Sequence, residues 1–213
     1  MKQHQPGITG AILAGGLGRR MGGVDKGQLA VAGVPLIERV LGCLLPQVEH
    51  ILINANRHTA EYDRYGYPVI TDQTSGFQGP LAGMASVLAA AETEFVLCVP
   101  CDAAWLPPDL ATRMATALAN SQGRVCTVHD GVWLHPVCSL IPRALLPDLR
   151  QWMTEGRREV AGWLQKQGLV TVSYPEWPSV YWSINTPADL ASVERRLRAN
   201  PVAPPALLLK GAA

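Results

Sequence analysis

The feature that most constrains the fold of this chain is the alternation of short apolar runs, rich in valine and isoleucine, with longer segments of helical periodicity. Such alternation is typical of βαβ units built around a parallel sheet. The first runs are almost continuously apolar, as expected of strands that helices cover on both faces. We therefore expect strands over residues 8–14, 50–55, 68–72, 94–100, 124–130, 135–141, 169–174 and 180–184.

Helical patterns fill the gaps between these runs. Pro35, Pro80 and Pro187 suit the first turn of a helix, where a missing N–H costs no hydrogen bond. Only "GVWL" separates the runs 124–130 and 135–141, and this hairpin spacing predicts an antiparallel pair. The chain therefore predicts an α/β fold of three layers, with a Rossmann-like, mostly parallel sheet and antiparallel additions in the second half. The expected helices span residues 35–46, 80–91, 108–120, 142–154, 158–167 and 187–198.

Charge and apolar patterning exclude several classes of protein. The net charge is +1, so no global field draws the chain to nucleic acid or to an anionic membrane. Gly15 and Gly16 break the first apolar run, which is too short for a signal peptide. No run reaches the roughly 18 apolar residues of a membrane span. We expect a cytoplasmic protein that binds its anionic ligands through local groups.

The cysteines are odd in number and scattered through apolar surroundings, which favours reduced, buried thiols over a disulfide framework. Only Cys98 and Cys101 form a CxxC pair, and Cys98 falls inside an expected strand. A zinc ribbon needs a second such pair, which the sequence lacks. We expect these thiols to serve packing, with redox or metal chemistry as the alternative.

The segment "LAGGLGRRMGGVDKG" (13–27) follows the first expected strand and combines repeated glycines with arginine and lysine. It fits neither GxGxxG, because Met21 takes the place of the third glycine, nor a P-loop, because Gly27 follows Lys26. Glycines let backbone N–H groups approach a ligand closely, and Arg20 and Lys26 can neutralise phosphates. We expect a nucleotide polyphosphate here. The alternative is a glycine-rich turn with solvated basic residues.

Polar residues follow three of the expected strands. Asp102 follows the run 94–100, and a carboxylate beside a triphosphate is a natural Mg²⁺ ligand. The alternative for Asp102 is a helix cap or a satisfied polar residue. Asn54, Asn56 and Asp72 end two further strands and suit the edge or ribose of a nucleotide, although turn chemistry also explains such residues.

Taken together, these motifs resemble those of the molybdenum cofactor guanylyltransferases, which belong to the nucleotidyltransferase superfamily. The resemblance covers residues 8–198 and rests on "LAGGLGRRMGGVDKG", "NANR", Asp72, "GPLAGM", "PCD" and "NTP" in the family's order. The general superfamily loop has a Pro-Lys pair, whereas Gly16 and the pair Asp25 and Lys26 are typical of the molybdopterin branch and favour GTP over CTP. The implied fold is similar to that of the nucleotide-diphospho-sugar transferases.

The resemblance implies transfer of GMP from GTP to the terminal phosphate of molybdenum-bound molybdopterin, with release of pyrophosphate. It implies catalytic roles for Asp102, Lys26 and Arg20, and Mg²⁺ as the cofactor on Asp102. The nucleotide-binding residues that it implies are Leu13, Ala14, Gly15, Gly16, Lys26, Asn54, Asp72 and Asp102.

The acceptor is expected near Asn185, Arg157 and Arg158. Relatives often carry asparagine two residues before the "NTP" asparagine, and this chain has Ser183, whose hydroxyl has a shorter reach. His129 and His135 flank the expected hairpin and are read as structural, with a pterin contact as the alternative.

These implications divide the chain into parts. We expect one nucleotidyltransferase domain over 8–198, with a nucleotide half over about 8–120 and an acceptor half over about 121–198, and flexible ends over 1–7 and 199–213. Expected partners beyond the two substrates are molybdoenzyme clients and cofactor-insertion proteins. Three other functions stay open: a molybdopterin cytidylyltransferase, a sugar-phosphate nucleotidyltransferase, and a GTP-binding protein that delivers the cofactor without chemistry.

Overall fold

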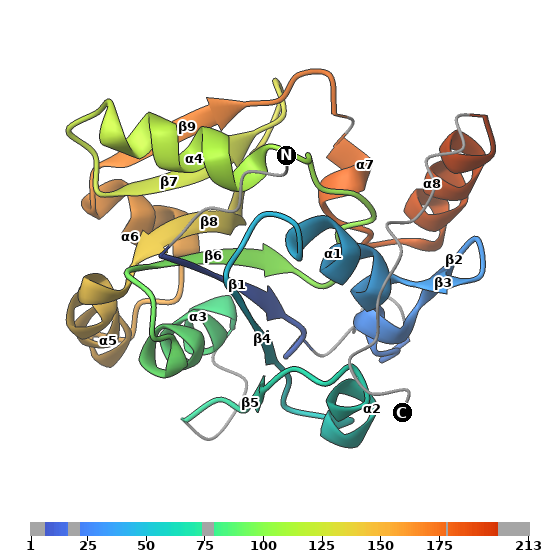
Figure 1. Ribbon diagram of the computed structural model, residues 1–213, viewed down its shortest axis with the longest axis horizontal. Helices are drawn as coiled ribbons and strands as arrows, with labels where there is room; N and C mark the ends of the chain where they lie inside the picture. Colours follow the sequence, from blue (N-terminus) through green and yellow to red (C-terminus); the bar gives the residue numbers. More distant parts are fainter. Residues whose placement is uncertain (1–6, 17–21, 74–78, 178, 200–213) are drawn as a thin grey trace.

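The computed structural model is built on one seven-stranded sheet (Figure 1) and describes residues 7–16, 22–73, 79–177 and 179–199. The strand order is β5-β4-β1-β6-β8-β7-β9. Neighbours from β5 to β6 are parallel, β8 is antiparallel to both β6 and β7, and β7 is parallel to β9. The strands are β1 (Ile8–Leu13), β4 (His50–Asn54), β5 (Val69–Ile70), β6 (Phe95–Pro100), β7 (Val125–His129), β8 (Leu134–Pro142) and β9 (Leu169–Ser173).

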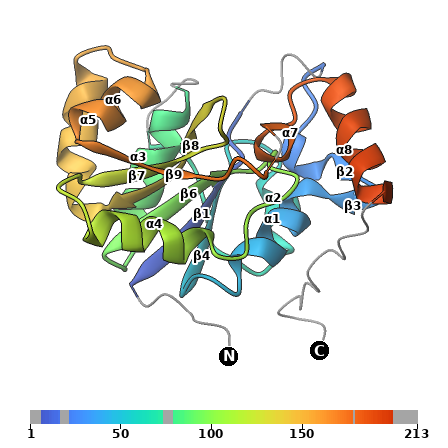
Figure 2. The same ribbon diagram turned by 90° about the horizontal axis from the view of Figure 1, so that it is seen from above.

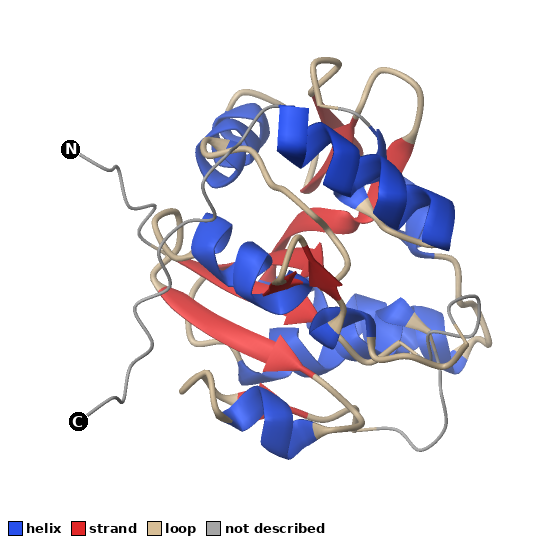
Figure 3. Cartoon of the chain, turned by 90° about the vertical axis from the view of Figure 1, so that its right-hand side faces the viewer, coloured by secondary structure: helices blue, strands red, loops and turns tan. Residues whose placement is uncertain are grey.

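Helices cover both faces of this sheet, which confirms the three-layer α/β fold (Figures 2 and 3). Figure 2 shows α3, α5 and α6 on one side and α1 and α4 on the other. A short hairpin of β2 (Ala30–Val31) and β3 (Val34–Pro35) lies beside α8. The helices are α1 (Leu36–Leu44), α2 (Thr59–Asp63), α3 (Pro80–Ala90), α4 (Leu110–Ala119), α5 (Leu146–Thr154), α6 (Val160–Lys166), α7 (Ser179–Trp182) and α8 (Pro187–Ala199).

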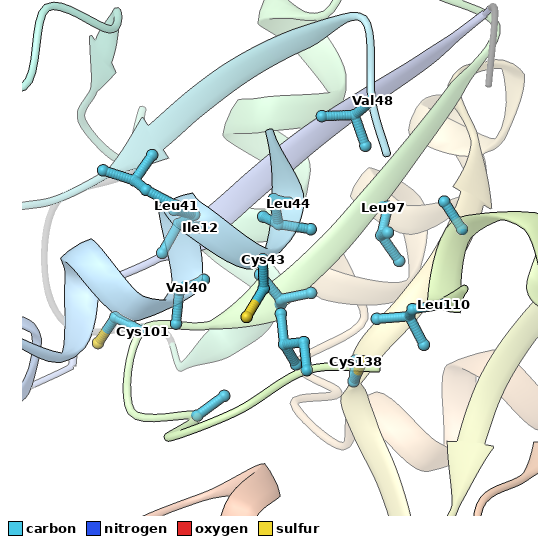
Figure 4. Packing of buried hydrophobic residues seen from close by; sticks show 14 of the residues in the cluster. Ile12, Val40, Leu41, Cys43, Leu44, Val48, Leu97, Cys101, Leu110 and Cys138 are labelled. Carbon is cyan, nitrogen blue, oxygen red and sulfur yellow. The ribbon is translucent and has the colours of Figure 1, made fainter. Parts of the chain in front are cut away.

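Helices bury the strands on both faces, and successive side chains of a strand point to opposite sides of the sheet and so enter different clusters. Ile12 of β1 and Leu97 of β6 belong to the hydrophobic cluster under α1 and α4 (Figure 4), and Leu13 belongs to the cluster under α3, α5 and α6. All the cysteines are free and buried, as the packing interpretation expects. Burial raises the pKa of Cys98 to about 12, so this thiol stays protonated at neutral pH.

One expected strand is wrong: residues 180–182 of the run 180–184 belong instead to the short helix α7 (Ser179–Trp182). The alternation of apolar residues suggested a strand, but the backbone here pairs with the loop that follows β6. The carbonyl of Tyr181 accepts the N–H of Ala104, and the N–H of Ile184 donates to the carbonyl of Asp102. These long-range bonds, together with burial of Trp182, override the local strand preference.

Other differences concern short elements and the chain ends. The β2–β3 hairpin and α2 were not expected, because segments of two to five residues carry little periodicity. Of the ends expected to be flexible, residues 1–6 and 200–213 lie outside the described part of the chain. Among the residues that the structure describes, no helix is both long enough and apolar enough to cross a membrane.

The strand order places a switch point beside β1. From β1 the chain moves outward to β4 and β5, and then returns to pair β6 with the other edge of β1. The crossover from β1 to β4 contains α1, and the crossover from β5 to β6 contains α3 on the opposite face of the sheet (Figure 2). In open α/β sheets, the carboxyl ends of strands at such a point border a ligand crevice.

We predict that Ile12→Ala destabilises the protein, because Ile12 is fully buried in the central strand and its truncation leaves a cavity. The free energy of unfolding, measured by chemical denaturation, should fall by about 2–5 kcal/mol. The control is Val132→Ala at an exposed position, which should change stability by less than about 0.5 kcal/mol. Equal effects of the two substitutions would contradict this account of the core.

Candidate active site

A cleft of about 610 Å³ lies at the carboxyl ends of β1, β4 and β6, a size typical of small-molecule sites. Both halves of the chain line it. The first half contributes the end of β1 with the start of the glycine-rich segment, the ends of β4 and β6, and the start of α3. The second half contributes the start of β8 and the segment that joins α7 to α8. Of the residues expected to bind ligands, the cleft contains Leu13, Ala14, Gly15, Gly16, Lys26, Asn54, Asp72, Asp102 and Asn185.

A short 3-10 turn, Lys26–Gln28, sets the position of Lys26. Asp25 precedes it, and its carboxylate accepts hydrogen bonds from the Gly27 N–H (3.1 Å) and the Tyr62 hydroxyl (2.5 Å). Burial raises the pKa of Tyr62, so the hydroxyl keeps its proton and donates. A Cβ on Gly27 would collide with that hydroxyl, and only glycine permits this approach.

The ammonium group of Lys26 joins the two halves of the cleft. Its Nζ donates to Oδ2 of Asp102 at 2.6 Å and to Oδ1 of Asn185 at 2.7 Å. Ser183 completes the cluster: its hydroxyl donates to Asp102 (3.1 Å) and accepts from the Asn185 amide (2.9 Å). The serine that departs from the family pattern therefore reaches both Asp102 and Asn185 despite its shorter side chain.

Asn185 is fixed by the start of α8. The Asp189 carboxylate accepts the N–H groups of Asn185 (2.9 Å) and Thr186 (2.8 Å), while the Asp189 N–H donates to the Thr186 hydroxyl. This reciprocal arrangement is a capping box. Burial alone would raise the pKa of Asp189, but these hydrogen bonds outweigh it and hold the pKa below its ordinary value. The charged carboxylate of Asp189 therefore fixes the backbone of Asn185, whose side-chain amide contacts Lys26.

The environment of Asp102 fits the divalent ion expected there. Its side chain is about one-tenth exposed at the end of β6, and Lys26 and Ser183 bond to Oδ2. Within the described residues, Oδ1 accepts no hydrogen bond, and no cluster of three or more acidic, histidine or cysteine groups could hold a metal by itself. One carboxylate in an open cleft suits Mg²⁺, which takes one or two carboxylates together with substrate phosphates.

A second polar cluster lies at the ends of β4 and β5. The side-chain amides of Asn54 (2.9 Å) and Asn56 (2.8 Å) donate to the two carboxylate oxygens of Asp72, and the Asp72 N–H donates to Oδ1 of Asn56. A Cβ on Gly83 would collide with Oδ1 of Asn54, and one on Gly15 would lie 2.8 Å from Nδ2 of Asn56. The two glycines thus leave room for a fixed cluster of hydrogen-bonding groups.

Two expected site residues are not brought into this cleft, and a third, Arg20, lies outside the described residues. Arg157 and Arg158 precede α6; the guanidinium of Arg157 covers the ring of Trp152 at 4.3 Å, and that of Arg158 donates to the carbonyl of Met153. Neither arginine lines the cleft.

His135 and Trp182 also line the cleft, although sequence reasoning had read the histidine mainly as structural. The rings of the two residues are stacked, with centroids 5.3 Å apart. The position of His135 directly after the hairpin turn was the one sequence feature that could have indicated its place in the cleft. For Trp182, the expectation of a strand over 180–184 hid its position.

Comparison with known proteins identifies close relatives in sequence. Residues 10–170 match the model of the MobA-like NTP transferase domain. A molybdenum cofactor guanylyltransferase from Shewanella frigidimarina is 39% identical over 182 residues, which cover 85% of this chain and 93% of that protein. One from Pasteurella multocida is 38% identical over 183 residues, covering 86% and 97%.

Solved structures confirm the fold. Molybdopterin-guanine dinucleotide biosynthesis protein A from Archaeoglobus fulgidus has a TM-score of 0.74 at 21% identity and covers 90% of this chain and 99% of its own. A 2-C-methyl-D-erythritol 4-phosphate cytidylyltransferase from Thermus thermophilus has a TM-score of 0.64 at 17% identity, covering 88% and 98%.

Gly83→Ala is predicted to disturb the Asn54 cluster, because the added methyl group displaces the amide that bonds to Asp72. A hydrogen bond to a charged group is worth about 1.5–3 kcal/mol, so nucleotide affinity measured by calorimetry should fall about tenfold or more. The matched control is Gly162→Ala in α6, where the new Cβ makes ordinary contact with Trp152 at 3.4 Å. That variant should bind nucleotide normally, and unchanged affinity in Gly83→Ala would refute the close-approach argument.

Proposed function

The chain belongs to the family of the MobA-like NTP transferase domain and is a nucleotidyltransferase, and from this premise we propose that it transfers GMP from GTP to molybdenum-bound molybdopterin. Pyrophosphate is the second product. The names of the sequence relatives support guanylyl transfer to this cofactor. The observation that carries the proposal is the position of Lys26, whose ammonium group contacts Asp102 from the nucleotide half and Asn185 from the acceptor half. A cation at that junction lies where the phosphates of two substrates would meet.

In this proposal the nucleoside of GTP binds between the end of β1 and the Asn54–Asp72–Asn56 cluster. Asp72 carries a carboxylate, and guanine offers two adjacent N–H donors on one edge, so the pair is complementary. The amides of Asn54 and Asn56 hold both carboxylate oxygens in place while leaving lone pairs for the base. Gly15 and Gly16 line the same part of the cleft and would let the nucleoside lie against the backbone.

Charge neutralisation carries the chemistry that we propose. An oxygen of the acceptor's terminal phosphate attacks the α-phosphorus of GTP in line, the bond from this phosphorus to the bridging oxygen breaks, and pyrophosphate leaves with that electron pair. Lys26 binds the phosphate oxygens, and Arg20 is proposed to do the same. Mg²⁺ held by Asp102 would neutralise further phosphate charge when it is bound. A phosphate monoester is largely ionised near neutral pH, so no protein group needs to take its proton.

The ion pair in the structure suggests how the site responds to its substrates. Lys26 and Asp102 are each other's charged partners at 2.6 Å. A triphosphate would offer Lys26 a more highly charged partner. We propose that the Lys26 ammonium then leaves Asp102 for the phosphates, and that the Asp102 carboxylate, freed from Lys26, would hold Mg²⁺.

Asp102→Asn should lower turnover by about 100-fold or more, because it removes a charge that holds the ion against the phosphates. Pyrophosphate release measures turnover, and calorimetry without Mg²⁺ should show GTP affinity close to that of the unaltered protein. Asp63→Asn, at an exposed position in α2, is the matched control and should leave both values unchanged. Turnover near the unaltered level in Asp102→Asn would reject the metal role.

Base selectivity is tested by pyrophosphate release with molybdenum-bound molybdopterin and a panel of GTP, CTP, ATP and UTP. We expect turnover with GTP and little with the others. Equal turnover with CTP would reject the guanine assignment and favour a cytidylyltransferase. GTP binding with no pyrophosphate release would favour a delivery protein.

Asp72→Asn should lower kcat/KM for GTP by about tenfold or more, because a carboxamide replaces one acceptor oxygen with a donor.

A further inference from the structure

His135 has no role in the reaction as proposed above, yet it lies in the cleft wall near the start of β8. Its side chain is 16% exposed, and one face of the ring is stacked on Trp182 with an interplanar angle of 26°. Its Nε2 lies 2.8 Å from Oδ2 of Asp130. The histidine is therefore held on two sides, by a carboxylate and by an indole ring.

Asp130 is a fixed carboxylate at the turn between β7 and β8. Its side chain is fully buried, and Oδ1 accepts the N–H groups of Val132 (2.8 Å) and Trp133 (2.7 Å). Burial alone would raise the pKa of Asp130, but hydrogen bonds from Ser179, these two N–H groups and His135 outweigh it and hold the pKa well below its ordinary value. An ionised carboxylate only accepts hydrogen bonds, so Nε2 of His135 carries a hydrogen.

Nδ1 is then the ring nitrogen of His135 that remains for another partner. Within the part of the chain that the structure describes, Nδ1 has no hydrogen-bond partner. Asp130 is the charged group beside the ring, while the neighbouring Trp182 and the Tyr174 beyond it are uncharged aromatic residues. The carboxylate of Asp130 thus holds one ring nitrogen, and the indole of Trp182 holds the plane of the ring. An anion at Nδ1 would complete that environment.

The charges of the residues that line the cleft favour a phosphate of the acceptor as this anion. Among the described lining residues, Lys26 is the one lysine or arginine, and the carboxylates are those of Asp72 and Asp102. The proposed reaction brings two phosphorylated substrates together, and Lys26 lies at their junction. His135 lies on the wall formed by Leu134–Cys138 of β8 and belongs to the acceptor half. It is the group on that wall which can become positively charged.

We propose that His135 binds the phosphate of the acceptor through Nδ1 as an imidazolium, and that Asp130 is a positioning residue that orients and charges the ring. This inference rests on the proposed function and extends it to the second substrate, a phosphate monoester attached to a planar heterocycle. Stacking on the buried Trp182 also fixes the plane of the His135 ring in this wall.

The test is His135→Gln, because the glutamine amide can keep the hydrogen bond to Asp130 while the nitrogen that faces the ligand is lost. We expect the KM for molybdenum-bound molybdopterin to rise about tenfold or more, with the KM for GTP unchanged. The matched control is His129→Gln on the same hairpin, where Nδ1 accepts the N–H of Gly131 and the residue does not line the cleft. It should leave both KM values unchanged.

Asp130→Asn tests the positioning role. It removes the charge behind the imidazole but keeps the shape of the side chain, so the acceptor KM should rise severalfold while kcat and the KM for GTP stay near those of the unaltered protein. A purely structural role would instead lower the melting temperature and kcat together and affect both substrates. An acceptor KM within twofold of the unaltered value in both Asp130→Asn and His135→Gln overturns the proposal.

Direct binding separates this inference from the proposed function. Calorimetry with hydroxymethylpterin monophosphate, on protein loaded with GTP in the absence of Mg²⁺, needs no turnover. If the unaltered protein releases no pyrophosphate but binds this probe, and His135→Gln binds it at least tenfold more weakly, the guanylyltransferase proposal fails and the phosphate site stands. Equal affinity in the two proteins, or no binding to the unaltered protein, rejects the His135 site.

Discussion

The site depends on one ammonium group, which lies among partners contributed by distant parts of the chain. Lys26 bonds to Asp102 at the end of β6 and to Asn185 at the start of α8, and Ser183 ties those two residues together. Taking these charges out of water is costly unless each stays paired and hydrogen-bonded. The surrounding structure serves that requirement: Asp25 and Tyr62 hold the turn before the lysine, and Asp189 holds the backbone before α8.

The sheet explains why these groups meet. Parallel strands with a switch point beside β1 bring the ends of β1, β4 and β6 to one edge, and the residues that follow them form the nucleotide half of the cleft. How closely the backbone can approach these polar side chains then depends on the size of the residues beside them. Gly15 and Gly83 border the Asn54–Asp72–Asn56 cluster, and a methyl group on either would press on an amide that fixes the carboxylate. At this edge, the small size of the two glycines is therefore a condition for the hydrogen bonds that hold Asp72 in place.

Sequence reasoning reached the parts of this arrangement that follow from local pattern. Periodicity predicted the parallel sheet, and polar residues after strands predicted that Asn54, Asp72 and Asp102 would share an edge, as they do. It failed where tertiary contacts decide: the run ending at Ile184 became α7 because its backbone pairs with the loop after β6. The link between His135 and Asp130 was equally hidden, because a turn brings the two together and no spacing rule marks it.

The reversed direction of β8 has a consequence for how related proteins can diverge. Because β8 runs against β6, its first residues, Leu134 and His135, lie at the same edge as the last residues of β1 and β6. The turn that precedes it, residues 130–133, leads directly into this edge, and its Val132 and Trp133 are exposed. Lengthening or shortening that turn would remodel the mouth of the acceptor half while leaving the nucleotide half intact. Changes in this one hairpin could therefore alter binding of the second substrate without altering binding of the nucleotide.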